Sequence, residues 1–204
     1  PDKRRVPGLS EGDWSATNMS SWKTLSRRVI LEHSMYLTVE EHTVELPDGR
    51  VIEHWPWIIT PDFVNVLPYS AGGEFLCFRQ EKYALEGLSL APVGGYIEPG
   101  EAPLAAAQRE LREEMGCIAD EWVHLGSYKA GANRGIATGH LYLALDARQS
   151  GEPCSDDLEP QELVRLSPRE MEDAVMAGEF KLVPWSANVA LALLALRRRG
   201  IRWV

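Results

Sequence analysis

The sequence predicts an α/β protein of the α+β kind: a three-layer α/β/α sandwich around a mixed sheet, with a small antiparallel sheet at the N-terminus. Two observations carry this prediction. Segments of strand character alternate with two or three helical segments, and residues 29–60 are rich in strand-forming residues. With 204 residues, 45% hydrophobic and 25% charged, the chain can bury one main core and a smaller appendage. We expect an arm and dimerising sheet at 1–60 and the main domain at 61–204.

The N-terminal part divides into an arm and a sheet. Residues 1 to about 20 are rich in Pro, Gly, Ser and Asp, which is typical of a mobile arm, and order is expected to begin near Trp22. Strand-like segments then run from 29 to 60, broken at 46–50 by a turn in which a proline fixes φ and a glycine permits a positive φ. This pattern predicts a small antiparallel sheet.

A helix is predicted after Pro103. Proline is tolerated in a first turn, the following residues are good helix formers, and Gly116 supplies a C-terminal stop. One stripe of this helix is mostly apolar and is expected to be buried: Leu104, Ala107, Gln108, Leu111 and Met115. Further strands are expected at 65–67, 75–79 and 140–145, and further helices from Ser167 to about Gly178 and from Ser186 to Arg199.

Composition and charge exclude several classes of protein. A formal net charge of −9 opposes nonspecific attraction to nucleic acid, and the sequence has no zinc-finger spacing. The three cysteines are widely spaced, which indicates reduced thiols in a cytoplasmic protein. The longest apolar run, 189–196, is too short to cross a bilayer, and the N-terminus lacks a secretory signal. We expect neither nucleic acid nor a membrane as a partner.

The most informative stretch lies between residues 95 and 117. It holds four glutamates and an arginine: Glu101, Arg109, Glu110, Glu113 and Glu114. Carboxylates one turn apart on a helix repel one another by a few tenths of a kcal/mol per pair, so a helix that needed only solubility would more often interleave lysines. A divalent cation reverses this penalty, and the i, i+4 spacing of Glu110 and Glu114 suits Mg²⁺. The plainer interpretation is a solvated acidic face with arginines as ion-pair partners.

The same stretch resembles the Nudix box, G-x5-E-x7-R-E-U-x-E-E-x-G-U with U aliphatic, at every fixed position except the last, which is Cys117. Nudix hydrolases bind magnesium around a diphosphate, so the resemblance implies Mg²⁺, with Mn²⁺ as an alternative, and a Nudix-like three-layer sandwich. From about residue 22 to 199 the chain also resembles ADP-ribose pyrophosphatases and related nucleoside-diphosphate-sugar hydrolases. It departs from them at Ala91, often glutamate there, and at 129–132, where they have a Ser-Pro-Gly turn.

The resemblance implies an activity and a set of roles. Members of this branch cleave the pyrophosphate to give a nucleoside monophosphate and a sugar phosphate, and commonly form homodimers through the N-terminal sheet. Arg109 is expected to organise the carboxylates, and Glu114 and Glu113 to take part in catalysis. The groups expected to bind or orient the metal are Glu110, Glu114, Glu113, Glu101 and the carbonyl of Gly94.

Substrate-binding residues are expected outside the box. Arg79 is a candidate for contact with a phosphate or ribose, with an exposed arginine on an edge strand as the alternative. Trp55 and Trp57 are candidates to stack on the base, with core packing as the alternative. In an acidic loop beyond the box, Asp157 is the candidate general base or water-orienting group and Glu159 an auxiliary metal ligand, unless the loop is only a solvated connection.

Three function classes stay open. The first is a Mg²⁺-dependent nucleotide-sugar pyrophosphatase with ADP-ribose as the favoured substrate. The second is a Nudix hydrolase that acts on another nucleoside diphosphate derivative or a nucleoside triphosphate. The third is a noncatalytic sensor of a nucleotide sugar. The complete set of Arg109 and box glutamates favours an enzyme over a sensor, and a small nucleotide is the expected ligand in each case.

Overall fold

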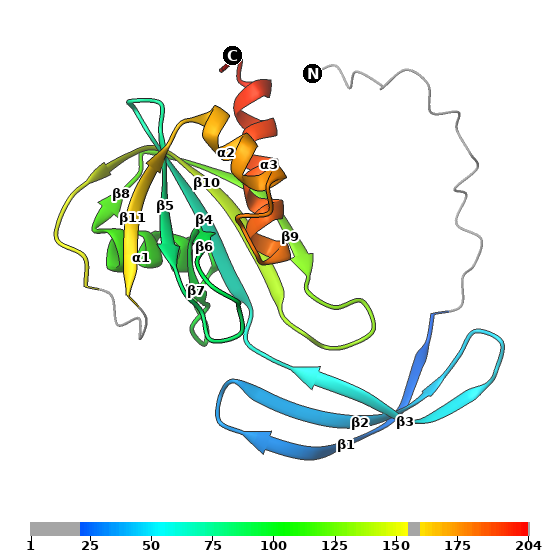
Figure 1. The fold of residues 1–204 in the computed structure, drawn as a ribbon. Coiled ribbons are helices and arrows are strands. Elements are labelled where there is room, and N and C mark those ends of the chain that lie inside the picture. Colours follow the sequence, from blue (N-terminus) through cyan, green and yellow to red (C-terminus); the bar gives the residue numbers. More distant parts are fainter. Residues whose placement is uncertain (1–20, 155–159, 204) are drawn as a thin grey trace, which may run out of the picture.

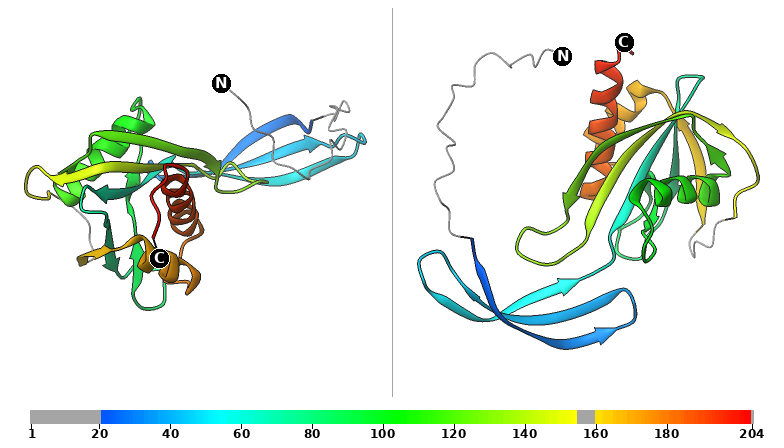
Figure 2. Two further views of the ribbon diagram at one scale, coloured as in Figure 1. Left: turned by 90° about the horizontal axis from the view of Figure 1, so that it is seen from above. Right: turned by 180° about the vertical axis from the view of Figure 1, so that it is seen from behind.

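The computed structural model describes residues 21–154 and 160–203, and in these residues it contains two sheets and three helices (Figure 1). The smaller sheet is antiparallel. The larger is mixed and lies between helices, with α1 on one face and α2 and α3 on the other (Figure 2). The predicted three-layer α/β/α class with a small N-terminal sheet is confirmed. Residues 1–20, expected to form an arm, lie outside the described residues.

The small sheet holds β1 (Lys23–His33), β2 (Leu37–Glu45) and β3 (Val51–Ile59), in that order. The turn predicted at 46–50 joins β2 to β3. Gly49 has a φ of +85° there, a conformation that favours glycine. β1 is an edge strand, and all 11 of its residues are exposed. The sheet therefore presents one long strand whose outer edge pairs with no other strand among residues 21–154 and 160–203.

The larger sheet has the strand order β11-β5-β4-β10-β8, with β6 paired to β5, β7 to β4 and β9 to β10. β10 and β4 run parallel, whereas the other pairs are antiparallel. The strands are β4 (Phe63–Ser70), β5 (Phe75–Gln80), β6 (Ser89–Ala91), β7 (Val93–Tyr96), β8 (Cys117–Ile118), β9 (Glu121–Lys129), β10 (Thr138–Gln149) and β11 (Gln161–Leu166).

The larger sheet divides between β4 and β5. These strands pair only at Tyr69 and Phe75, and beyond that point they diverge. β7 then continues on β4 while β6 continues on β5. Pro92, between β6 and β7, carries the chain from one half of the sheet to the other. This crossing brings the glycines of β7 beside α1.

The helices begin and end where the sequence signals lie. α1 (Pro103–Met115) ends at Gly116, which is left-handed with a φ of 62°. α2 (Pro168–Met176) starts with the predicted capping box, in which Ser167 and Glu170 bond reciprocally. α3 (Val183–Arg198) starts before the expected Ser186, because a proline is tolerated in its first turn.

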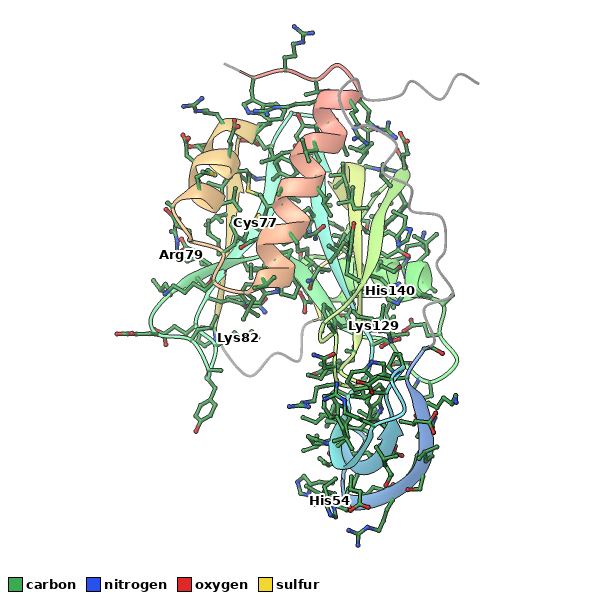
Figure 3. The ribbon with its side chains drawn as sticks, turned by 90° about the vertical axis from the view of Figure 1, so that its right-hand side faces the viewer. His54, Cys77, Arg79, Lys82, Lys129 and His140 are labelled. Atoms are coloured by element: carbon green, nitrogen blue, oxygen red, sulfur yellow. The ribbon has the colours of Figure 1, made fainter. Side chains whose placement is uncertain are left out.

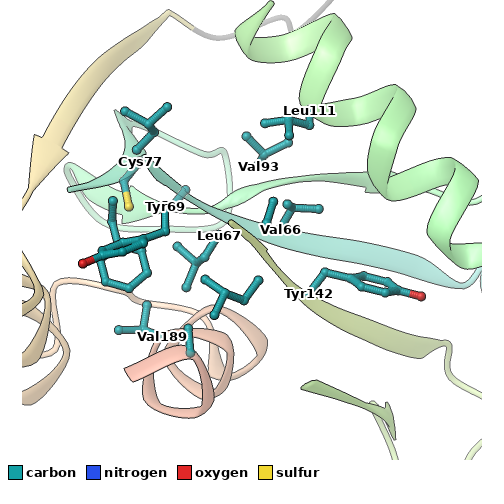
Figure 4. Packing of buried hydrophobic residues seen from close by; sticks show 14 of the residues in the cluster. Val66, Leu67, Tyr69, Cys77, Val93, Leu111, Tyr142 and Val189 are labelled. Carbon is teal, nitrogen blue, oxygen red and sulfur yellow. The ribbon is translucent and has the colours of Figure 1, made fainter. Parts of the chain in front are cut away.

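Buried hydrophobic side chains fill both sides of the larger sheet (Figure 4). Leu111 of α1 lies with Val66 and Val93 on one side, and Val189 of α3 lies with Leu67 on the other. Removing large side chains of this kind from a core typically costs about 2–5 kcal/mol, so both helices are firmly held on the sheet.

The buried stripe of α1 differs in part from the prediction. Ala107, Leu111 and Met115 are buried as expected, but Leu104 is 41% exposed and Gln108 is exposed. Ala106 and Glu110 are buried instead. The helix is rotated so that Glu110 faces β7. The pattern of apolar residues could not indicate this rotation, because the side chain that it buries is a polar glutamate.

The loop between β9 and β10 holds the small sheet. The indole Nε1 of Trp55 donates to the carbonyl of Asn133 at 3.1 Å, and the backbone N–H of Ala137 donates to Thr60 Oγ1 at 3.2 Å. At Gly135, a Cβ would stand 2.2 Å from Nε1 of Trp57, so only glycine allows this approach. These contacts fix the small sheet against the larger one.

Two further expectations concern thiols and membranes. All three cysteines are free, with Cys77 and Cys117 buried and Cys154 exposed. Burial raises the pKa of the Cys77 and Cys117 thiols, so they stay protonated. Within residues 21–154 and 160–203, no helix combines the length and apolar character needed to cross a membrane.

Candidate active site

Two glycines let β7 lie close to its neighbours, Gly95 against α1 and Gly94 against β4. A Cβ at Gly95 would stand 2.1 Å from Oε1 of Glu110, and a Cβ at Gly94 would stand 2.3 Å from the carbonyl oxygen of Val64. Both distances are too short for a real contact. At Gly94 the neighbour is backbone, so that position requires glycine, whereas at Gly95 a side chain would displace the carboxylate of Glu110. The carboxylate of Glu110 consequently lies directly on the strand, and the residue is only 8% exposed.

Arg109 joins three carboxylates. Its Nε and Nη2 donate to the two oxygens of Glu101 at 3.0 and 2.9 Å, which forms a bidentate pair. Its Nη1 donates to Glu110 Oε1 at 2.8 Å and to Glu113 Oε2 at 3.0 Å. Its Nη2 also donates to the carbonyl of Tyr96 at 3.1 Å. One guanidinium therefore ties the box glutamates to the end of β7.

The carboxylates of this cluster differ in their electrostatics. Burial is the main influence on Glu110 and raises its pKa, although Arg109 acts in the opposite direction. Hydrogen bonds from Arg109 lower the pKa of Glu101. The bonds to Glu101 are also the main cause that raises the pKa of Arg109, so the guanidinium stays charged. The cluster thus combines a buried carboxylate with a permanent cation.

An open cavity of about 430 Å³ lies over this cluster. Tyr36 and Tyr96 form an aromatic wall, with ring centroids 5.5 Å apart and planes at 42°. Met35 and Tyr36 come from the turn between β1 and β2, so the small sheet supplies part of the lining. The lining residues are Met35, Tyr36, Tyr96, Ile97, Glu98, Arg109, Glu110, Glu113, Glu114 and Cys154.

Met35 and Tyr36 are not among the residues predicted from the sequence. Residues 34–36 form a short turn between β1 and β2, in which Ser34 has a φ of 59°, and the sequence pattern did not predict this turn. Only the docking of the small sheet brings this turn to the box, and docking depends on contacts between residues far apart in the chain. In the structure both side chains are exposed, at 65% for Met35 and 51% for Tyr36, but this exposure cannot be read from the sequence.

The expected metal ligands that lie within the described residues line two cavities. Among the residues that the structure describes, no three His, Cys, Asp or Glu side chains are grouped as a metal site. The donor chemistry nevertheless suits a hard cation, because Glu110, Glu113 and Glu114 line the open cavity. Gly94 and Glu114 also meet at a second, smaller cavity. Arg109 neutralises two of these carboxylates here, so a bound cation would share them with the guanidinium.

Arg79 does not line either of these cavities. Its Nη1 lies 3.3 Å from Glu162 Oε2, an ion pair between β5 and β11. Side chains alternate along a strand, so Arg79 shares the face of Cys77, whose sulfur lies 3.7 Å from that of Met171 in α2. Lys82, which is labelled with Arg79 in Figure 3, lines the smaller cavity instead. The same alternation, applied to the sequence, places Phe78 and Gln80 on the opposite face of β5 from Arg79, and both line the smaller cavity.

The two tryptophans of β3 contact protein groups. Trp57 stacks on His42 with ring centroids 5.1 Å apart, and Trp55 meets Trp22 edge-on at 5.2 Å. Neither tryptophan lines the cavities described above. In this structure both contribute to the small sheet and its docking on the β9–β10 loop.

The two residues expected to act from the acidic loop, Asp157 and Glu159, lie outside the described residues.

The fold and the carboxylate site together define a Nudix hydrolase. The NUDIX domain model matches residues 59–187, and the model of the nucleoside diphosphate sugar hydrolase N-terminal domain matches residues 22–58. The chain therefore belongs to the Nudix family and is a hydrolase that resembles ADP-ribose pyrophosphatases.

Two characterised relatives are similar over most of their length. The chain is 27% identical over 181 residues to the ADP-ribose pyrophosphatase of Bacillus subtilis, covering 86% of this chain and 92% of that protein. It is 26% identical over 179 residues to the CMP-5'-(N-acetyl-N-hydroxy-3-aminopropyl)phosphonate hydrolase of Streptomyces rubellomurinus, covering 88% and 84%. A solved ADP compounds hydrolase superposes with a TM-score of 0.75 at 22% identity, covering 89% of this chain and 97% of that chain, which supports the fold.

Proposed function

We propose that the protein hydrolyses the pyrophosphate bond of a nucleoside diphosphate sugar, with ADP-ribose favoured, to give a nucleoside monophosphate and a sugar phosphate. The observation that carries this proposal is the carboxylate cluster around Arg109 beneath a cavity of about 430 Å³. Similarity to an ADP-ribose pyrophosphatase over 86% of the chain supports the choice of substrate.

A second candidate is hydrolysis of another nucleotide joined through a phosphorus anhydride. The specific observation in its favour is the match to a hydrolase of a CMP-linked phosphonate, which is 26% identical over 179 residues. The two candidates share the bond that is cleaved and differ in the groups on either side of it. A noncatalytic sensor is disfavoured because Arg109, Glu110, Glu113 and Glu114 are all present around the cavity.

The proposed cofactor is Mg²⁺, with Mn²⁺ as an alternative. Glu110, Glu113 and Glu114 would hold it, together with the carbonyl of Gly94, because these are hard oxygen donors beside the cavity. Bound there, a divalent cation neutralises charge on the diphosphate and favours attack at phosphorus. Arg109 holds the carboxylates in position and offsets their repulsion before any ligand enters.

The aromatic wall is the proposed place for the nucleoside. Tyr36 and Tyr96 offer ring faces beside the acidic groups, and a base stacks on such faces for about 1–3 kcal/mol. In the reaction, water adds to one phosphorus, the bond from that phosphorus to the bridging oxygen breaks, and a carboxylate takes the proton of the water. Glu113, which lines the cavity, is a candidate for this base. Asp157 is a second candidate, supported only by the resemblance to related pyrophosphatases.

We also propose a homodimer formed through the N-terminal part, 1–60, while residues 61–204 carry catalysis. The edge strand β1 exposes Leu25, Val29, Ile30 and Leu31, each about half exposed. A long exposed edge with apolar side chains readily pairs with another chain, and a second copy of the same strand is the partner we propose.

A substrate panel tests the proposed function. ADP-ribose, other nucleoside diphosphate sugars, a CMP-linked phosphonate and nucleoside triphosphates would be incubated with and without Mg²⁺, and the products separated by chromatography. AMP and ribose 5-phosphate formed only with the metal is the expected result. Cleavage restricted to the CMP-linked phosphonate would favour the second candidate, and no cleavage of any compound would contradict both.

A further inference from the structure

A second cavity adjoins the active site where the larger sheet divides. It has a volume of about 60 Å³ and touches strands β4, β5 and β7 as well as the start of α3. Glu114 lines this cavity and the open one, so the two meet at a carboxylate of the box. The lining residues are Asn65, Phe78, Gln80, Lys82, Pro92, Gly94, Glu114, Gln161 and Trp185.

Two buried amides in the lining lack full hydrogen bonding. Asn65 and Gln80 are each 4% exposed. In the described residues, Nδ2 of Asn65 and Oε1 of Gln80 are buried and have no hydrogen-bond partner. Buried polar groups are nearly always paired in folded proteins, so an unpaired donor and an unpaired acceptor at one cavity require an explanation.

The amides are complementary to a hydroxyl group. Nδ2 of Asn65 can donate a hydrogen bond, and Oε1 of Gln80 can accept one. One hydroxyl group can accept a hydrogen bond from Nδ2 of Asn65 and donate one to Oε1 of Gln80. The volume of about 60 Å³ corresponds to about four water molecules at about 15 Å³ each, which admits a small polar group but not a nucleobase.

We propose that this cavity binds a hydroxyl group on the sugar half of the substrate and that Asn65 and Gln80 determine specificity for it. The inference rests on the proposed function. Because Glu114 lies between the cavities, a diphosphate at the box would extend its nucleoside toward Tyr36 and its sugar toward the amides. Both orphan atoms have almost no exposed surface, so each amide must turn toward the cavity before it can bond the hydroxyl. Binding of the hydroxyl would then pair both atoms, and a substrate without it would leave them unpaired.

The test compares two substrates that differ only in hydroxyl groups. ADP-ribose is set against the ADP ester of tetrahydrofurfuryl alcohol, which keeps the ring and lacks the hydroxyls. The wild-type protein is expected to prefer ADP-ribose by about a hundredfold in kcat/KM. Asn65→Leu and Gln80→Leu should each reduce that preference to about tenfold or less, mainly through loss of activity on ADP-ribose.

A matched control comes from α3. Asn188 is fully buried, and both of its amide atoms lack partners, but it does not line the cavity. Asn188→Leu should keep the hundredfold preference. Thermal unfolding supplies a second readout, because replacing an unpaired buried amide by an apolar residue of similar size should not lower the midpoint.

The outcomes separate the inference from the proposed function. A wild-type preference that persists unchanged in folded, active Asn65→Leu and Gln80→Leu proteins would overturn the inference alone. Failure of both variants to fold would show that the amides maintain the fold and would also overturn it. Absence of turnover of either substrate by the wild-type protein would instead defeat the proposed function, and the inference with it.

Discussion

Glu110 and Gly95 are so close that no side chain fits between them. A Cβ on Gly95 would stand 2.1 Å from Oε1 and 2.6 Å from Oε2 of Glu110. The carboxylate is buried against the strand and receives a hydrogen bond from Arg109 at 2.8 Å. The position of this carboxylate, a proposed metal ligand, therefore depends on the absence of a side chain on the neighbouring strand.

We predict that Gly95→Ala abolishes most activity while the protein stays folded. The added methyl group displaces the Glu110 carboxylate, and a shift of about 1 Å at a catalytic group can reduce the rate about a hundredfold. Steady-state kinetics with circular dichroism would measure both effects. Gly151→Ala is the control, because no atom lies within 4 Å of a Cβ there. Equal activity in the two variants would contradict the prediction.

Glu114 is predicted to be required for a metal-dependent reaction. Glu114→Gln keeps the volume and removes the charge, and a loss of about 4 kcal/mol of transition-state stabilisation lowers kcat/KM about a thousandfold. Excess chelator should reduce the wild-type rate to a similar level, and added Mg²⁺ should restore it. Undiminished turnover in the variant or in chelator would refute the role given to Glu114.

Arg109→Lys is predicted to weaken the response to Mg²⁺. A lysine carries one compact charge and cannot bond Glu101 at both oxygens while it also reaches Glu110 and Glu113. Groups that orient metal ligands typically contribute about tenfold to a hundredfold in metal affinity or activity. A Mg²⁺ titration of the rate should therefore show a higher half-saturating concentration. Arg148→Lys, on an exposed ion pair, serves as the control.

Gly135→Ala is predicted to loosen the docking of the small sheet. A Cβ there would stand 2.2 Å from Nε1 of Trp57, and overpacking of this kind costs about 1–3 kcal/mol. Because the turn with Tyr36 depends on this docking, KM should rise more than kcat falls. Gly72→Ala is the comparison, since its nearest atom would be 3.5 Å away. A KM identical in both variants would show that the turn is held by other contacts.

The homodimer proposal predicts that charge on β1 produces monomers. Val29→Lys with Leu31→Lys places two cations on the exposed edge strand, where pairing with a second copy would bury them. Light scattering at micromolar concentration should give a dimer for the wild-type protein and a monomer for the double variant. Tyr83→Lys, on a fully exposed side chain elsewhere, should stay dimeric. A monomeric wild-type protein would end the proposal.

Local signals were sufficient for much of the fold. Pro103 and Gly116 marked both ends of α1, and the capping box at Ser167 marked the start of α2, because each signal acts within a few residues. β9 and β11 were not predicted. All of their residues are exposed or partly exposed, so these strands lack the sharp alternation of buried and exposed residues that identifies a half-buried strand.

The site was predictable only where its residues are close in sequence. The box glutamates and Arg109 lie within two turns of helix and one preceding loop, so their spacing is informative alone. Tyr36 and Asn65 reach the site through sheet docking and through the divergence of β4 from β5. Such placement arises from contacts over long stretches of chain, which no local pattern encodes.

The turn that carries Met35 and Tyr36 belongs to a sheet that shares no strand with the one beneath Glu110. In the proposed function, bond cleavage and part of the choice of substrate thus fall to two separate sheets of one chain. Mutations that change the length or the side chains of that turn do not alter the packing beneath the carboxylates. Under the proposed function, the substrate can therefore change during evolution while the groups that hydrolyse its bond stay the same.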